Sequence, residues 1–341
     1  MLLKIRKRVT NTNVRKFLLS WIKLAITIAA FAYIIYTIYN IPKEEFANWI
    51  ENLDFTFLSF LIIILTVLLS ALNWYFESVK WKMLASSVQE ISILAAFKSV
   101  LFGVSLGMIT PKRLGEFAGR IMVLNRENRL KGLLLNTAAS FSQLSVTLMF
   151  GIASILILFI MQQKPMEDSS FDMSFIVIIS IIVLSLLLSI LAFYRPIARI
   201  IAKKIKSKKW KDTVITLEYI KPSIAAKLVT LSIFRYVIFV IQFYFILTIL
   251  GLDIGFIEVL ILQSIIFLIM VILPISALAE SGVKGSVTLL VFAAFPQFID
   301  GFYETAALGA SLGIWFVNLA LPAVAGVLIS IYEGVKIKLS V

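Results

Sequence analysis

Long apolar stretches alternate with short polar segments along the whole of this 341-residue chain. Six of them contain about 20 mostly apolar residues, which is the length that an α-helix needs to cross a bilayer core of ~30 Å. The pattern therefore predicts six transmembrane helices in an all-α polytopic membrane protein. The predicted spans cover residues 17–40, 55–76, 132–161, 173–194, 224–250 and 306–331.

Two further apolar regions, 95–125 and 256–297, are interrupted by proline, glycine and charged residues. A helix over the apolar part of the first, 95–110, would be about 24 Å long, which is shorter than the bilayer core. We expect both regions to form re-entrant or broken-helix hairpins, each entering and leaving the membrane on one side. The alternative is a pair of ordinary interfacial loops between complete spans.

The distribution of lysine and arginine predicts the orientation, because these residues are enriched in cytoplasmic loops. One set of segments contains 26 of them and the complementary set contains 2. We therefore expect a multi-pass protein of the cytoplasmic (inner) membrane, with both termini in the cytoplasm and the two hairpins oppositely oriented. The first set is 1–16, 76–98, 111–131, 195–221 and 332–341, and the second is 41–55, 162–172, 251–258 and 297–305.

The two hairpins share a sequence pattern, although they lie 163 residues apart. In each, an apolar half-helix is followed by a proline, by a short polar segment with glycine, glutamate and a cation, and by a second apolar half-helix. Such backbone is tolerated at membrane depth only around a cavity, which is typical of an inverted repeat with a binding site near the midplane. The expected elbow residues are Pro111, Gly115, Pro274 and Gly282.

An inverted repeat would make the chain a single membrane domain, 1–341, in two halves. The first half, about 17–161, contains the hairpin 95–125, and the second half, about 173–331, contains the hairpin 256–297.

Charged residues within these elements are the candidate functional residues. An unpaired charge at membrane depth costs at least about 2.5–3.5 kcal/mol, so such residues usually pair or face a cavity. Arginine suits an anionic lipid because its planar fork can bind two phosphate oxygens at once. The glutamates would position the cations or neutralise them when no lipid is bound. The predicted head-group or phosphate site consists of Arg113, Glu116, Arg120, Glu280 and Lys284, with Arg235 as an outlying member.

One pair in this set has a purely local interpretation as well. Glu116 and Arg120 are four residues apart, a spacing that by itself produces an ion pair on one face of a helix. Both interpretations can hold together.

Composition excludes several kinds of chemistry. The chain is 60% hydrophobic and 15% charged, with a mean hydropathy of +1.00 and with no cysteine or histidine. A disulfide framework, a cysteine nucleophile, an imidazole base and a zinc site of His or Cys ligands are therefore excluded. We assign the net charge of +13 to cytoplasmic flanks and lipid head groups, not to a nucleic-acid partner. No cofactor or metal site is expected, and a transporter fits the composition better than an enzyme.

The first hairpin resembles a known family. Its pattern of Pro111, Arg113, Gly115 and Glu116, with Arg120 one turn later, is similar to the first signature of the lysylphosphatidylglycerol synthase transmembrane-region family. Members of that family are flippase-like integral membrane proteins. The resemblance covers nearly the whole chain in length and in segment order.

The second signature of the family, Pro-Ile-Ser followed by glycines and Gly-Val-Arg-Glu, is matched in order by residues 274–276 and 282–284. Two positions differ, because Lys284 stands where the family has arginine and Gly285 where it has glutamate. Glu280, one turn before Lys284, is the candidate to replace that carboxylate. Better-known relatives add a soluble aminoacyltransferase domain, which we expect to be absent because the chain ends at Val341, directly after its last span.

These inferences favour translocation or binding of an anionic phospholipid, or of a polyprenyl-phosphate-type lipid, across the cytoplasmic membrane. A membrane-embedded head-group transferase with Glu116 or Glu280 as general base is a second possibility, although the chain has no histidine, cysteine or extended soluble loop to serve it. A third is a membrane scaffold subunit, whose partner would be a separate glycosyltransferase or aminoacyltransferase.

Overall fold

The computed structural model describes residues 28–51, 53, 56–110, 113–161, 173–273, 279–299 and 303–332. This part of the chain is helical and contains no β-strand, as the apolar pattern predicts. A first helix, Ile28–Asn40, precedes the others. These are α2 (Lys43–Glu51), α3 (Phe57–Ala85), α4 (Ile93–Ile109), α5 (Leu114–Ile121), η2 (Arg126–Asn128), α6 (Arg129–Met161), α7 (Met173–Lys204), α8 (Lys208–Ile215), η3 (Thr216–Tyr219), α9 (Pro222–Ile249), α10 (Phe256–Ile272), α11 (Glu280–Ala294), η4 (Pro296–Phe298), α12 (Glu304–Trp315), the π-helix η5 (Phe316–Ala320) and α13 (Leu321–Tyr332).

Four of the described helical segments are long and apolar enough to cross a membrane, as expected for a polytopic membrane protein. They are Phe57–Ala85, Arg126–Met161, Pro222–Ile249 and Glu304–Tyr332, and they correspond to four of the six predicted spans. The other two spans remain predictions. The predicted span 17–40 lies partly outside the described residues, and 173–194 falls in α7, where the apolar stretch is Ile178–Leu187.

The helix of the second predicted span extends further than its apolar pattern indicates. It begins at an N-cap, where the hydroxyl of Thr56 accepts a hydrogen bond from the backbone N–H of Ser59 at 3.2 Å. We expected the span to end at residue 76, but α3 continues to Ala85. The extra turns place Glu77 and Lys80 in the interior, where they are 4% and 0% exposed. The start of the expected cytoplasmic segment 76–98 is therefore buried.

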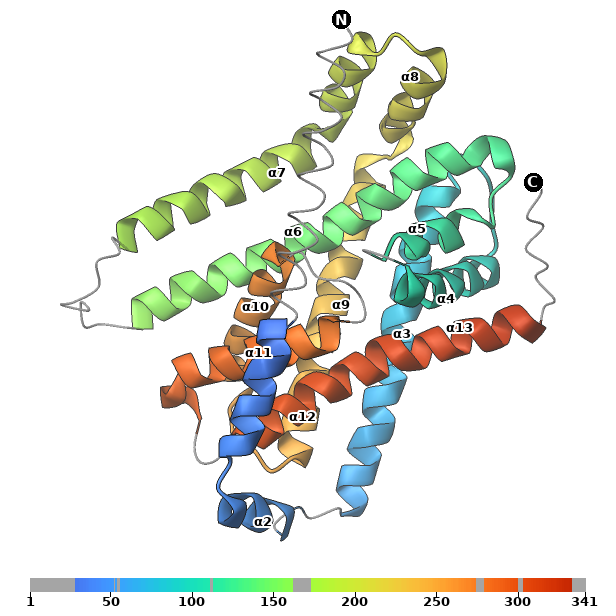
Figure 1. Cartoon of the computed structure of the whole chain (residues 1–341). Helices are drawn as coiled ribbons and strands as arrows, with labels where there is room; N and C mark the ends of the chain where they lie inside the picture. Colours follow the sequence, from blue (N-terminus) through green and yellow to red (C-terminus); the bar gives the residue numbers. More distant parts are fainter. Residues whose placement is uncertain are drawn as a thin grey trace, which may run out of the picture.

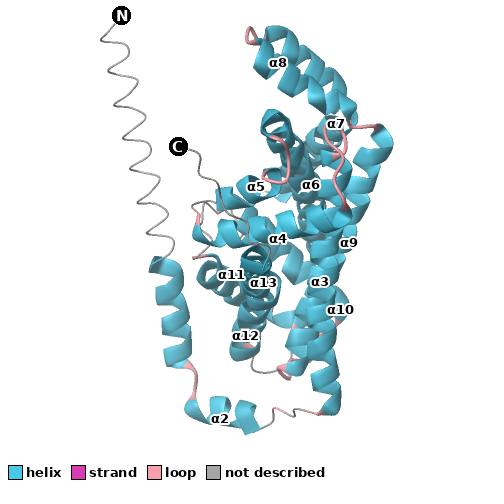
Figure 2. Ribbon diagram, turned by 90° about the vertical axis from the view of Figure 1, so that its right-hand side faces the viewer, coloured by secondary structure: helices cyan, strands magenta, loops and turns pink. Residues whose placement is uncertain are grey.

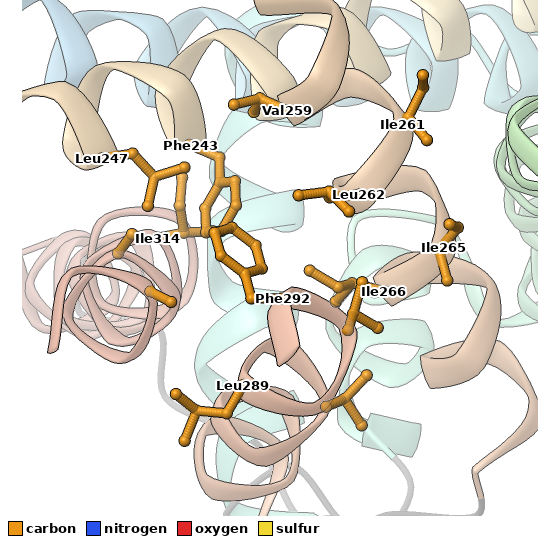
Figure 3. Packing of buried hydrophobic residues seen from close by; sticks show 14 of the residues in the cluster. Phe243, Leu247, Val259, Ile261, Leu262, Ile265, Ile266, Leu289, Phe292 and Ile314 are labelled. Carbon is orange, nitrogen blue, oxygen red and sulfur yellow. The ribbon is translucent and has the colours of Figure 1, made fainter. Parts of the chain in front are cut away.

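The largest apolar core lies between α9, α10, α11 and α12 (Figure 3). Phe243 of α9 and Phe292 of α11 meet edge to face, with their ring centroids 6.2 Å apart. Leu262, Ile266 and Ile314 surround them. Lipid tails are as apolar as these side chains, so close van der Waals packing, more than water exclusion, must hold such helices together.

α4 and α5 pack against each other as an antiparallel pair at backbone distance. A Cβ added to Gly119 would lie 2.4 Å from the Cα of Gly103, and one added to Gly115 would lie 2.3 Å from the carbonyl of Leu106. Only glycine allows so close an approach. The pair is also held to α13, because Ser105 Oγ donates a hydrogen bond to the carbonyl of Ala323 at 2.6 Å.

The second short pair, α10 and α11, lies between α9 and α12, while α4 lies beside α3 and α13 (Figure 1). Figure 2 places α2 at one end of the molecule and α8 at the other. Both short pairs lie between these two ends.

α7 bends near its C-terminal third. Phe193 has non-helical dihedral angles (φ −110°, ψ 17°), and Pro196 follows within the same helix. Proline removes a backbone donor and clashes with the preceding turn, so it accounts for the bend. Beyond the bend, Tyr194 donates a hydrogen bond to the carbonyl of Ile220 at 2.5 Å, which connects this part of α7 to the short segment between η3 and α9.

Candidate functional site

The structure brings together charged residues of the two predicted hairpins. Arg113, directly before α5, lies beside Glu280, the first residue of α11. Its Nη1 atom is 3.1 Å from Oε2 of Glu280, and its Nη2 atom is 2.5 Å from Oε1 of Glu116. One guanidinium thus joins two carboxylates from distant parts of the chain. All three side chains are half-buried.

The backbone at Arg113 is strained. Its φ of 56° and ψ of 27° lie in the left-handed region, which residues other than glycine rarely adopt. Thr110 supports the turn, because its hydroxyl accepts a hydrogen bond from the N–H of Gly115 at 2.7 Å. Non-glycine residues in this conformation cost about 1–3 kcal/mol and cluster at binding sites. Gly115 lies in the first turn of α5, whereas Pro111 lies outside the described residues.

Arg120 lies deeper than Arg113 and is 4% exposed. Its Nη1 atom is 2.5 Å from Oε1 of Glu77 and donates a hydrogen bond to Oδ1 of Asn136 at 2.9 Å. Its Nη2 atom is 3.9 Å from Oε2 of Glu116. The i,i+4 ion pair is therefore present, but it is longer than the contact with Glu77.

Glu77 lies at the centre of the charged residues, and sequence reasoning missed it. Its carboxylate contacts Arg120, Lys80 at 3.4 Å, and Nη1 of Arg235. Three cations from α3, α5 and α9 thus surround one buried carboxylate. Because the apolar stretch ends at residue 76, the sequence pattern predicts a cytoplasmic position for Glu77 instead.

The sequence does contain a signal that could have identified Glu77. Polar residues recur three and four apart along α3, at Ser70, Asn73, Glu77 and Lys80. This spacing places them on one helical face, and all four are buried. A polar stripe of this kind in an apolar helix indicates a face that points into the protein.

Arg235 was predicted as an outlying candidate, but it lies beside the centre of the network. Its guanidinium pairs with Glu77, and its Nε atom donates a hydrogen bond to Oδ1 of Asn73 at 2.6 Å. The guanidinium carbon also lies 5.7 Å from the ring centre of Trp74. Asn73 also contacts Asn318 at 3.4 Å. Asn318 belongs to the π-helix η5, an irregularity that is common at functional sites.

Lys284 differs from the other candidates. It is 7% exposed, and its ammonium lies 5.2 Å from the ring centre of Phe267. No described carboxylate lies within ion-pairing distance of it, because Glu280 pairs with Arg113 instead. Gly282 lies in the first turn of α11, where an added Cβ would meet the ring of Phe31 at 2.5 Å, and Pro274 lies outside the described residues.

The ion pairs around Glu77 and Arg113 form one continuous series that leads into the interior. Within the described part of the chain, this series and Lys80 comprise four cations and three carboxylates. A phosphate can take the place of a carboxylate opposite an arginine fork, because both present oxygens to the same parallel donors. No group of three His, Cys, Asp or Glu residues that could hold a metal ion occurs among the described residues. The members in order are Glu280, Arg113, Glu116, Arg120, Glu77 and Arg235.

A family model described as lysylphosphatidylglycerol synthase TM region matches residues 20–326. No curated protein matches the chain. The matched region contains both short helix pairs and every residue of the ion-pair series.

Proposed function

The chain belongs to the family of the lysylphosphatidylglycerol synthase TM region, and from this premise we propose that it moves an anionic lipid head group across the membrane. The family indicates a multi-pass membrane protein related to lipid modification or translocation. The finer assignment to translocation rests on one observation, a series of ion pairs that begins where the starts of α5 and α11 meet and continues inward to Glu77 of α3 and Arg235 of α9.

The proposed topology combines six spans with two re-entrant pairs in an inverted repeat. The order of helix lengths supports it, because α3, α4 and α5 have 29, 17 and 8 residues, and α9, α10 and α11 have 28, 17 and 15. A long helix follows each set of three: α6 follows the first set, and α12–α13 follows the second. A helix of 17 residues rises about 26 Å, which is less than the ~30 Å core. Each short pair would therefore turn back within the membrane, and the two would open toward opposite faces.

In the proposed mechanism, the described contacts correspond to a resting state in which carboxylates neutralise the arginines. The lipid phosphate would replace Glu280 and Glu116 at the fork of Arg113. The ion pair of Arg113 with Glu280 also joins α5 to α11. Replacing Glu280 by the phosphate would therefore open the contact between the helix pair α4–α5 and the helix pair α10–α11. Lys284, which has no described ion-pair partner, would supply a second positive charge to the phosphate. The acyl or prenyl chains would stay in the bilayer.

The test is lipid translocation by the purified protein in liposomes, with labelled phosphatidylglycerol and a reagent that bleaches only the outer leaflet. Arg113→Gln should lower the rate by roughly tenfold or more, since a hydrogen bond to a charged group contributes about 1.5–3 kcal/mol. Lys284→Gln should lose most of the rate, and Lys284→Arg should retain it because the charge is kept. Glu280→Gln should retain substantial movement, because it removes one of the two carboxylates that compete with the phosphate for the fork of Arg113.

The exposed ion pair of Arg199 and Glu218 provides the control, because it lies outside the proposed site. Arg199→Gln should move lipid at the wild-type rate. Wild-type rates in both Arg113→Gln and Lys284→Gln would overturn the proposed site. Mass spectrometry of the recovered lipid tests the enzymatic alternative: a covalently altered head group with wild type, but not with Glu280→Gln, would identify a transferase.

A further inference from the structure

A cavity of about 330 Å³ lies between α6, α7 and α9, away from the ion-pair series itself. Its volume is in the range of ligand-binding pockets. The bent part of α7 forms one wall, and α6 and α9 form the others. The lining includes Phe141, Tyr194, Ile197, Ala198, Ala225 and Val229.

The few polar side chains in this lining have their hydrogen bonds satisfied within the wall. Thr137 donates to the carbonyl of Leu134 at 2.6 Å, and Ser142 donates to that of Ala139 at 2.7 Å. The hydroxyl of Tyr194 donates to Ile220, as described above. The cavity therefore presents hydrocarbon to an occupant, and none of its described lining residues is charged.

One wall of the cavity is linked to the charged residues by hydrogen bonds. The hydroxyl of Ser142, in the cavity wall, lies 3.1 Å from that of Ser232. Ser232 in turn accepts a hydrogen bond from the ammonium of Lys80 at 2.9 Å, and Lys80 pairs with Glu77. Two hydroxyl groups thus separate the apolar cavity from a cluster in which cations outnumber carboxylates.

We propose that this cavity holds one hydrocarbon chain of an anionic lipid whose head group is bound by the neighbouring cations. The proposal deepens the proposed function and rests on it. The lining selects an apolar chain, the adjacent excess of cations selects a negative head group, and both features occur together in an anionic membrane lipid. One helix would contribute to both recognitions, because α9 carries Ala225 in the cavity lining as well as Ser232 and Arg235 beside the charged cluster.

The test uses a long-chain alkyl phosphate with a photoreactive diazirine at the end of its chain, added to the purified full chain in uncharged lipid nanodiscs. Cross-linked peptides are located by mass spectrometry and are expected on α6, α7 and α9 at the cavity. Two neighbouring alanines of α9 form a matched pair, because Ala225 lines the cavity whereas Ala226 is exposed outside it. Ala225→Trp should reduce the cavity cross-links roughly tenfold or more by filling the space, and Ala226→Trp should leave them unchanged.

Cross-links elsewhere in the wild type, or equal cavity cross-links in the two tryptophan variants, would overturn the cavity proposal. If Ala225→Trp is not monodisperse, Ala138→Leu fills the opposite wall with a smaller addition and is judged by the same criterion. Translocation separates the two proposals. If Arg113→Gln abolishes lipid movement while Ala225→Trp has wild-type cross-links and movement, the cavity proposal fails and the proposed function stands. If wild type moves no lipid, the proposed function fails, and the cross-links still report on the cavity.

Discussion

At the scale of single residues, the buried charges depend on one another. Glu77 is the only described carboxylate that contacts Lys80, Arg120 and Arg235, which are all nearly inaccessible. A charge in low dielectric is tolerated when it is paired, and removing one partner leaves the others uncompensated. The side chain that sequence reasoning missed is therefore the one on which these cations most depend.

We expect Glu77→Gln to destabilise the protein, because the neutral amide keeps the shape but leaves Lys80 and Arg235 without their counter-charge and Arg120 with only the longer contact to Glu116. Breaking a buried pair in this way costs roughly 3–5 kcal/mol. The measurement is the thermal unfolding midpoint in detergent, with Glu218→Gln at the exposed contact with Arg199 as the matched control. A midpoint for Glu77→Gln as high as that of the control would refute the central role of this carboxylate.

At the scale of elements, the glycines differ in what surrounds them. Gly119 of α5 faces backbone, since an added Cβ would lie 2.4 Å from the Cα of Gly103. Gly313 of α12 faces a flexible side chain, since the same addition would lie 3.3 Å from Cδ1 of Ile246. Backbone cannot move aside without separating the helices, whereas the end of an isoleucine side chain can adjust. The two positions should therefore respond differently to the same substitution.

The expected result is that Gly119→Ala lowers thermal stability and expression, while Gly313→Ala is neutral or slightly stabilising. Overpacking typically costs about 1–3 kcal/mol, and alanine gains up to about 1 kcal/mol over glycine in a helix interior. The two variants are compared by unfolding midpoint and by size-exclusion profile. Equal stability of the two would mean that α4 and α5 do not pack at backbone distance.

At the scale of the whole molecule, orientation in the membrane is the main expectation to test. The excess of lysine and arginine predicts that the loop before α6 is cytoplasmic and that the loop containing α2 is external. The structure refines the count, because Lys80 and Arg120 are buried in the protein and are not loop charges. Removing these two leaves the asymmetry large, so the predicted orientation is unchanged.

Because the chain contains no cysteine, single cysteines can report this orientation without background. We expect Glu44→Cys, on exposed α2, to react with an impermeant thiol reagent added to intact cells. Glu127→Cys, exposed in η2, should react only after the cells are opened. The opposite pattern would reverse the predicted topology, and labelling of both positions from outside would contradict the charge argument altogether.

The apolar pattern of the sequence was sufficient to predict the helical class and the four long helices that the structure describes. A helix that spans a bilayer must satisfy its backbone hydrogen bonds within itself, so the length and composition of one segment decide it. The family resemblance is likewise recognisable from sequence alone, because it depends on two short motifs, one around Arg113 in the first hairpin and one around Lys284 in the second. The charged residues of those motifs are also recognisable from sequence, because charge is rare in an apolar setting.

Only the tertiary structure decided which charges meet. Arg113 and Glu280 are 167 residues apart, and Glu77 and Arg235 are 158 apart. Local spacing predicts that Arg120 pairs with Glu116, but the closest contact of Arg120 is with Glu77. The same spacing predicts that Lys284 pairs with Glu280, but Glu280 pairs with Arg113. Which carboxylate lies within a few ångströms of a given guanidinium depends on how α3, α5, α9 and α11 pack. That packing depends on small residues and side-chain shapes across the whole bundle, which no single segment of sequence contains.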